Sequence, residues 1–121
     1  MRPRAGLCIP VRYLRCRDGD TIEVALPKSD YVWAIRLVDC WCPELRDKGG
    51  EEARAYAQSV LEDCEDLHLF VPLEPGANIL KTLTTFDRLV GELWVSQTTT
   101  LNDMLVDAGH ATRRKGESAN G

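Results

Sequence analysis

The order in which two hydrophobic periodicities follow one another constrains this chain more than any other feature. Residues 7–16, 21–27 and 30–41 are rich in apolar and β-branched side chains, and the second and third of these stretches alternate at period two. Turn-forming residues separate them, Arg-Asp-Gly-Asp in the first gap and Lys-Ser-Asp in the second. The first third of the chain therefore predicts three strands joined as a meander.

The remainder of the chain adds two helical patterns and two further strand patterns. Residues 49–67 predict an amphipathic helix. Its apolar stripe has the spacing i, i+3, i+4, i+7, i+8, i+11 and consists of Ala53, Tyr56, Ala57, Val60, Leu61 and Cys64. Residues 67–73 and 88–95 predict two strands, and residues 98–110 predict a second helix.

The order of three strands, a helix, two strands and a helix indicates a fold that is mainly β with helices, in the α+β class. Five short strands with a helix after the third are typical of a small OB-type Greek-key barrel. In the C-terminal helix, Thr100 and Asp103 resemble a capping box, and Gly109 supplies a stop. We expect a single OB-fold domain over residues 1–112 and a flexible, basic and polar tail over residues 113–121.

Composition limits the class of protein. The 121 residues are 44% hydrophobic and 28% charged, which is ordinary for a soluble globular domain. No apolar run approaches the roughly 20 residues of a membrane span, so we expect no membrane association. The basic first residues are not followed by an apolar segment, which predicts a cytoplasmic protein. A signal removed from a longer chain would leave no trace. We also expect a monomer.

Cysteine usage and net charge narrow the choice further. The five cysteines are odd in number and irregularly spaced, which favours reduced thiols over a disulfide framework. Cys40 and Cys42 share one face of the predicted third strand and could begin a metal site, although buried small hydrophobes are the alternative. A formal net charge of −4 argues against nonspecific nucleic-acid binding over a broad basic surface, but a few arginines could still hold a phosphate.

Two charged residues fall on the predicted apolar faces of strands. Asp20 shares its face with Ile22 and Val24, and Arg36 shares its face with Ala34 and Val38. A lone buried charge is costly by several kcal/mol, so each residue needs a partner or a position at the mouth of the barrel. A structural Asp20–Arg36 ion pair is one interpretation, and a functional pocket is the other.

Five segments together resemble the staphylococcal nuclease (thermonuclease) family. They are Asp-Gly-Asp-Thr-Ile-Glu-Val at 18–24, Ile-Arg-Leu-Val-Asp-Cys-Trp-Cys-Pro-Glu at 35–44, the helical pattern at 50–63, the arginine-bearing strand region at 85–95, and the last helical pattern at 101–111. The similarity spans residues 11–112. The OB barrel of that family agrees with the order of elements predicted above.

The resemblance implies calcium-dependent hydrolysis of DNA or RNA phosphodiesters, with single-stranded nucleic acid as the partner. By position, Asp20 and the backbone carbonyl of Cys42 would be calcium ligands, since calcium prefers oxygen. Glu44 would activate the attacking water. Arg36 and Arg88 would hold the phosphate and stabilise charge in the transition state.

The pattern departs from the family at several positions. The second ligating aspartate falls on Trp41, whose indole donates only, and Asp39 would replace it only if the strand bulged by two residues. A family glycine is Asp87, and the loop at 45–50 is short. The stacking tyrosines beyond the last helix are absent, and this chain has four other residues there, Thr112, Arg113, Arg114 and Lys115.

Two functions from different classes follow from these residues. The first is a metal-dependent nuclease, weakened by Trp41. The second is a non-catalytic OB-fold module that binds nucleic acid or protein.

Overall fold

The computed structural model describes residues 6–72 and 88–114, with Arg88 described by its backbone alone. The described residues form one mixed sheet of six strands and two helices, an α+β arrangement. The strands are β1 (Gly6–Pro10), β2 (Arg12–Asp18), β3 (Thr21–Ala25), β4 (Val32–Leu37), β5 (His68–Pro72) and β6 (Arg88–Trp94). The helices are α1 (Gly50–Glu62) and α3 (Leu101–Asp107).

The first predicted strand is two strands in the structure. Residues 7–16 were expected to form one strand, but the ladder breaks at Val11, between β1 and β2. β1 pairs antiparallel with β5, whereas β2 pairs antiparallel with β3. The Val11 N–H takes part in neither ladder and donates instead to the Leu67 carbonyl at 3.0 Å. The expectation of five strands was therefore wrong by one, because the two halves of one segment have different partners.

The strand order is β1-β5-β6-β4-β3-β2, and all neighbouring pairs are antiparallel except β4 and β6. Among the described residues the hydrogen-bonded sheet is open, since it runs from β1 to β2 without a ladder between these two end strands. The expected closed barrel is therefore not formed as a continuous ladder. The end strands are nevertheless neighbours in sequence, joined by Val11.

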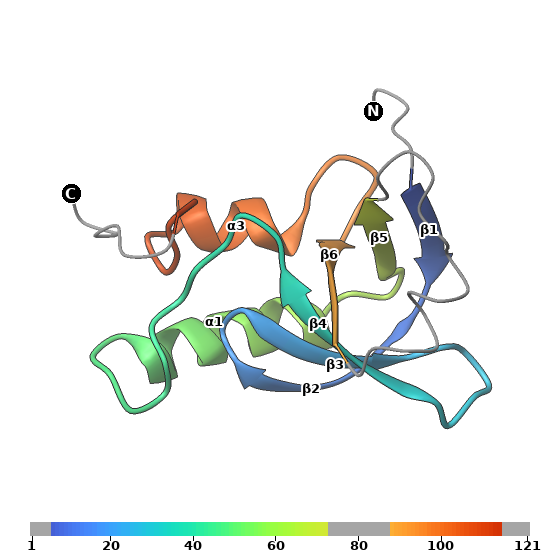
Figure 1. Ribbon diagram of the computed structural model, residues 1–121, viewed down its shortest axis with the longest axis horizontal. Coiled ribbons are helices and arrows are strands. Elements are labelled where there is room, and N and C mark those ends of the chain that lie inside the picture. The colour runs from blue at the N-terminus through green and yellow to red at the C-terminus, as the bar shows by residue number, and fades with distance from the viewer. Residues whose placement is uncertain (1–5, 73–87, 115–121) are drawn as a thin grey trace.

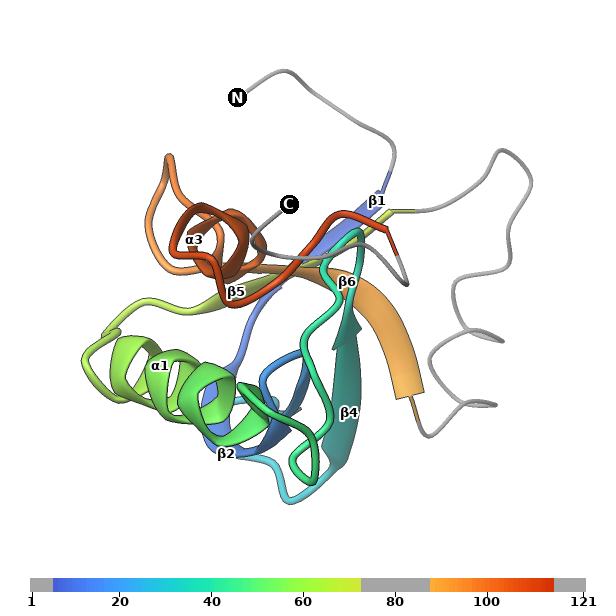
Figure 2. The same ribbon diagram turned by 90° about the vertical axis from the view of Figure 1, so that its left-hand side faces the viewer.

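The two helices contact each other and cover different strands. α1 packs against β2, and α3 packs against β6 (Figure 1). Figure 2 shows the helices from their own side of the molecule, with α3 above α1. The stripe predicted for the first helix is correct, because Ala53, Ala57 and Leu61 are its buried side chains together with Gly50. No helix in the described part of the chain is long and apolar enough to cross a membrane.

β4 turns a different face to the core from the one expected. Trp33, Ile35 and Leu37 belong to the hydrophobic core, whereas Arg36 lies on the opposite face with Val32. The prediction that Arg36 projects from the core side was wrong. Both sets of alternating residues in this strand are apolar, so periodicity alone did not distinguish them, and the bulkier set is the one that is buried.

The start and end of α3 follow the predicted signals. The Thr100 side chain accepts a hydrogen bond from the Asp103 N–H at 3.0 Å, and Gly109 adopts a left-handed φ of 82° two residues after the helix ends. Asn102 anchors this helix to the sheet. Its buried side chain accepts from the Leu93 N–H at 3.2 Å and donates to the Val38 carbonyl at 2.9 Å.

Candidate functional site

Asp20 stands immediately before β3, and its carboxylate is nearly buried, with 7% of the residue exposed. Oδ2 accepts the Cys42 N–H at 2.9 Å and lies 3.7 Å from Nη2 of Arg36. Oδ1 accepts the Thr21 hydroxyl at 3.4 Å. The ion pair considered from the sequence is therefore present, and one acidic and one basic residue of the predicted site meet.

The surroundings of Asp20 raise the pKa of its carboxyl to about 6. Burial is the largest cause, because it penalises the charged form, and a hydrogen bond with the Asp18 carboxyl acts in the same direction. The Cys42 N–H and the Arg36 guanidinium oppose the rise but do not cancel it. Asp18 and Asp20 are thus two carboxyl groups at one turn, and their proximity favours the protonated form of Asp20.

The Arg36 guanidinium is held by its own end of the strand. Nη1 donates to the Leu37 carbonyl and, at 2.8 Å, to the Cys40 carbonyl. On the other side the guanidinium carbon lies 3.9 Å from the centre of the Trp41 ring, a cation–π arrangement. With the Asp20 carboxylate nearby, Arg36 is engaged on several sides and its side chain is only 13% exposed.

The turn after β4 makes these contacts possible. Asp39 adopts a positive φ of 50°, so the chain reverses there and the Cys40 carbonyl faces back toward Arg36. The predicted strand at 30–41 therefore ends at Leu37, and Asp39 lies in an exposed turn instead of a bulged strand. Trp41 then exchanges two backbone hydrogen bonds with Thr112, at 2.8 and 3.0 Å.

Glu44 is not bonded directly to this group. Its side chain is 64% exposed and pairs with Arg46 at 2.9 Å, and among the described residues it makes no hydrogen bond or ion pair with Asp20 or Arg36. The Glu44 carbonyl packs instead against Gly50 at the start of α1, where an added Cβ would lie only 2.0 Å from that oxygen. The loop holds Glu44 by its backbone and leaves its carboxylate in solvent.

Arg88 is placed only by its backbone. It begins β6 opposite Ala34, and the next residue on the same face, Val90, lies opposite Arg36. This register puts residues 36 and 88 on adjacent strands of one sheet face. Asp87 and Lys115 lie outside the described residues.

The residues present do not fit a calcium site in this arrangement. Within residues 6–72 and 88–114 no group of three or more His, Cys, Asp or Glu side chains is placed to hold a metal ion. The Asp20 carboxylate already accepts a backbone N–H and faces a guanidinium, and the position of the second expected ligand is the indole of Trp41. Glu44, the carboxylate that the resemblance assigns to the attacking water, is exposed and paired with Arg46.

The chain matches no family model, and no curated protein matches it. The resemblance to the staphylococcal nuclease family therefore depends on the five segments and the geometry above.

All five cysteines are free thiols in the structure. A hydrogen bond with the nearby Cys40 thiol and burial both raise the pKa of the Cys42 thiol above its usual range. Cys42 packs against Gly19, where a Cβ would meet its sulfur at 2.8 Å. A thiol that stays protonated is a poor metal ligand, so the packing role predicted as the alternative fits this pair better.

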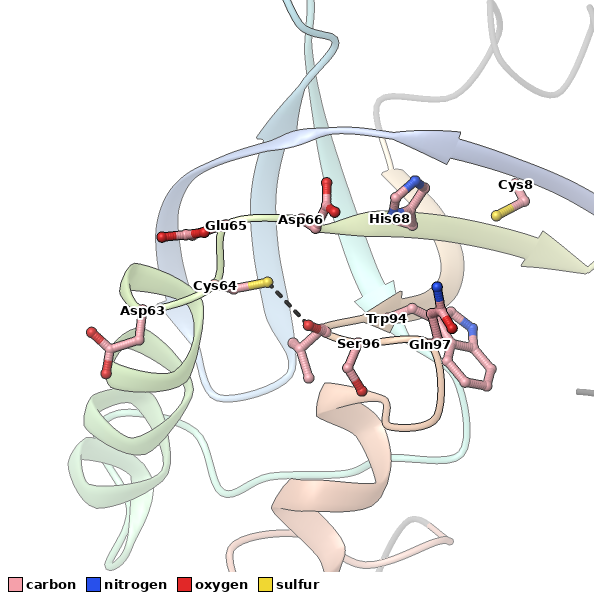
Figure 3. A pocket seen from close by; sticks show the side chains of 10 residues that line it. Cys8, Asp63, Cys64, Glu65, Asp66, His68, Trp94, Ser96 and Gln97 are labelled. Atoms are coloured by element: carbon pink, nitrogen blue, oxygen red, sulfur yellow. Dashed lines mark hydrogen bonds between the residues drawn. The ribbon is translucent and has the colours of Figure 1, made fainter.

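Two hollows lie away from the predicted site. The larger, about 780 Å³, is formed by the connection from α1 to β5 and the end of β6 (Figure 3). Its lining includes Asp63, Glu65 and Asp66, with His68 and Trp94 beside them, and among the described residues no lysine or arginine lines it. The smaller, about 510 Å³, lies between β2 and α1 and has the opposite charge.

Three arginines line the smaller hollow: Arg15 and Arg17 from β2 and Arg54 from α1. They were not identified as site residues from the sequence. The density of arginines in Arg-Tyr-Leu-Arg-Cys-Arg, residues 12–17, was the available signal. Their convergence with Arg54 depends on how the helix packs on the strand, which the sequence alone did not indicate.

Proposed function

We propose that this chain is an OB-type module that binds single-stranded nucleic acid without hydrolysing it. The sheet supports the OB assignment. If β1 and β2 are counted as one strand bent at Val11, the sheet has five strands. Its order then begins and ends with the two halves of that bent strand. A partly open five-stranded Greek-key barrel has this character.

The observation that carries the non-catalytic part of the proposal is the engagement of Arg36. An arginine that stabilises a phosphoryl transition state has to present its N–H groups to the substrate. Here the guanidinium donates to two carbonyls of its own turn, pairs with Asp20 and lies over Trp41. Releasing it for a phosphate would leave two carbonyls without their donor, which costs about 1–3 kcal/mol for each group, and would leave the buried Asp20 carboxylate without its counter-ion.

Nucleic acid as the ligand class is supported by the resemblance to the nuclease family together with the fold. OB-folds bind oligonucleotides across their strands, and single strands are held through phosphate contacts and base stacking. Trp41 is 37% exposed and Tyr31 is 51% exposed, so aromatic surface is available to bases.

Binding and cleavage are separable by experiment. A fluorescently labelled single-stranded oligonucleotide, DNA or RNA, is titrated with the protein in calcium and again in EDTA, and the same samples are run on a denaturing gel. We expect equal binding in both buffers and intact oligonucleotide. Calcium-dependent cleavage by the native chain would overturn the non-catalytic proposal, and absence of binding to either polymer would overturn the proposal as a whole.

A calcium-dependent nuclease is the second candidate, and one observation favours it. Asp18 and Asp20 share a hydrogen bond, and the raised pKa of Asp20 is the electrostatic state that a bound cation would relieve. Under this candidate Asp20, the Cys42 carbonyl, Arg36, Glu44 and Arg88 keep the roles that the resemblance implies.

The variant Trp41→Asp distinguishes the two candidates. It restores the carboxylate of the family pattern and removes the indole from the Arg36 guanidinium. If the chain is a nuclease weakened at this position, the variant should gain calcium-dependent cleavage, which the further change Glu44→Gln should abolish. A folded Trp41→Asp protein that leaves the oligonucleotide intact supports the binding module.

A further inference from the structure

We infer that the groove between β2 and α1 holds the phosphate backbone of the bound nucleic acid, at a surface separate from Asp20 and Arg36. The inference rests on the proposed binding function. Arg15, Arg17 and Arg54 line the groove, and Glu62 is the one carboxylate among the described residues that line it. The lining therefore has two more positive than negative groups, in a chain with a net charge of −4.

Arg15 and Arg17 are held side by side by a single carboxylate. Nε of Arg15 lies 2.9 Å and Nε of Arg17 lies 2.6 Å from the same oxygen, Oε2 of Glu23. The Glu23 side chain is only 12% exposed, and the two guanidinium groups lower the pKa of its carboxyl. One carboxylate neutralises one of two cations, so the pair keeps a positive charge and presents its remaining N–H donors outward.

The guanidinium groups are accessible to a ligand. The side chains of Arg15, Arg17 and Arg54 are 69%, 49% and 38% exposed. Arg54 lines the groove from α1, and its contact with Glu51 is a long, exposed one at 3.4 Å, of the kind that adds little stability. A phosphate can displace such a partner, and arginine binds phosphate oxygens in a bidentate manner.

The shape of β2 favours a polyanion over an added peptide strand. β2 is an end strand of the sheet, so its edge is the place where an acidic peptide would pair through its backbone. The register shifts between Tyr13 and Arg15 and again between Cys16 and Asp18. Two irregularities in seven residues disrupt the evenly spaced donors and acceptors that strand addition requires. Contacts to phosphate charges need no such regularity.

The larger hollow, at the connection from α1 to β5, has the opposite charge and would repel the same polymer. Its carboxylates, from Asp63, Glu65 and Asp66, lie along the connection that follows α1 (Figure 3). A single strand lying along the arginine groove therefore meets attraction on one side of α1 and repulsion beyond its end. This contrast confines the phosphate path to β2 and the facing side of α1.

The test compares arginines inside and outside the groove on the same protein. Arg17→Gln leaves Glu23 paired with Arg15, and Arg54→Gln removes the helix side of the groove. Arg12→Gln is the matched control, because Arg12 lies on the same strand, is exposed, and donates to the Ser29 carbonyl instead of lining the groove. Affinity for a labelled single-stranded oligonucleotide is measured at several salt concentrations, after thermal melting has verified that each variant is folded.

Each groove variant should weaken binding about fivefold at 0.1 M salt and lower the salt slope by about 0.7, as expected for one lost phosphate contact on a single strand. The control should change affinity less than twofold. Native protein that binds while both groove variants bind equally well overturns this inference alone. Native protein that does not bind overturns the proposed function and this inference together. Polyglutamate that competes as well as an oligonucleotide of equal charge would indicate an acidic protein partner and overturn the phosphate assignment.

Discussion

At the scale of single residues, the strand pattern predicted one part of the contacts around Asp20 and Arg36. The turn after β4 determines the other part. The sequence predicted that these two charges need partners, and they are partners of each other at 3.7 Å. It did not predict that Arg36 also donates to Leu37 and Cys40, because those carbonyls are presented by a turn with a left-handed residue, Asp39. Backbone direction in such a turn leaves no mark in side-chain periodicity.

The raised pKa of Asp20 makes stability depend on pH. The folded carboxyl keeps its proton to about pH 6, whereas an unfolded aspartate loses it near pH 4. The folded state therefore binds more protons between these values, and its stability falls as pH rises through this window. Asp20→Asn should remove this loss, so the variant should gain up to about 3 kcal/mol relative to the native chain between pH 4 and pH 7.

Urea unfolding at a series of pH values measures this difference. The slope is the informative quantity, because asparagine does not titrate and differs from protonated Asp20 by the same free energy at every pH, whereas ionised Asp20 is populated only as pH rises. Asp66→Asn, at an exposed position, is the control and should shift stability by less than about 0.5 kcal/mol throughout. Parallel curves for the native and Asp20→Asn proteins would show that Asp20 ionises normally.

At the scale of secondary-structure elements, local signals in the sequence predicted where helices begin. They did not predict which strands pair with one another. The Thr100 cap and the buried stripe of α1 were visible in the sequence because each is made within one helix. The break at Val11 was not visible in the sequence, because it arises from pairing with distant strands. One half of the apolar run pairs with β5 and the other half pairs with β3. The loop at 43–50 likewise takes its shape from contact with α1, and this contact turns Glu44 away from Asp20.

Two glycines at helix termini should respond differently to alanine. A Cβ at Gly50 would lie 2.0 Å from the Glu44 carbonyl oxygen, whereas a Cβ at Gly109 would meet nothing within 4 Å and would suffer only from the left-handed φ. We expect Gly50→Ala to lower the free energy of unfolding by about 3 kcal/mol, and Gly109→Ala by about 1 kcal/mol. Chemical denaturation at 25 °C compares them directly, and equal losses would mean that the loop yields to the added methyl group.

At the scale of the whole molecule, the α+β class and the succession of elements were predictable, and the assembly of the site was not. Strand and helix patterns each depend on neighbours a few residues away, so they survive in the sequence. Whether Glu44 bonds to the group around Asp20, or Arg54 lines the same groove as Arg17, depends on how a loop and a helix pack against distant strands. Glu44 was expected in the site but pairs with Arg46, whereas the shared groove of Arg54 and Arg17 was not expected.

Calcium should leave the thermal stability of the native chain unchanged. A ligand that binds only the folded state at a hundred times its dissociation constant adds about 2.7 kcal/mol, which would raise the melting temperature by several degrees. Because the described residues around Asp20 include no group of side chains placed to hold a metal ion, we expect melting temperatures in EDTA and in millimolar calcium to agree within about 1 °C. A larger rise with calcium, and not with the same concentration of sodium, would contradict this expectation.

The bend at Val11 has a mechanical consequence. The outermost strands on the two rims of the sheet are halves of one continuous segment, and the single residue between them is tied to the Leu67 carbonyl. Separation of the edge strand on one side of the sheet must therefore pull on the other edge strand through Val11. We expect the two edge strands to separate from the sheet in the same unfolding event and not one at a time.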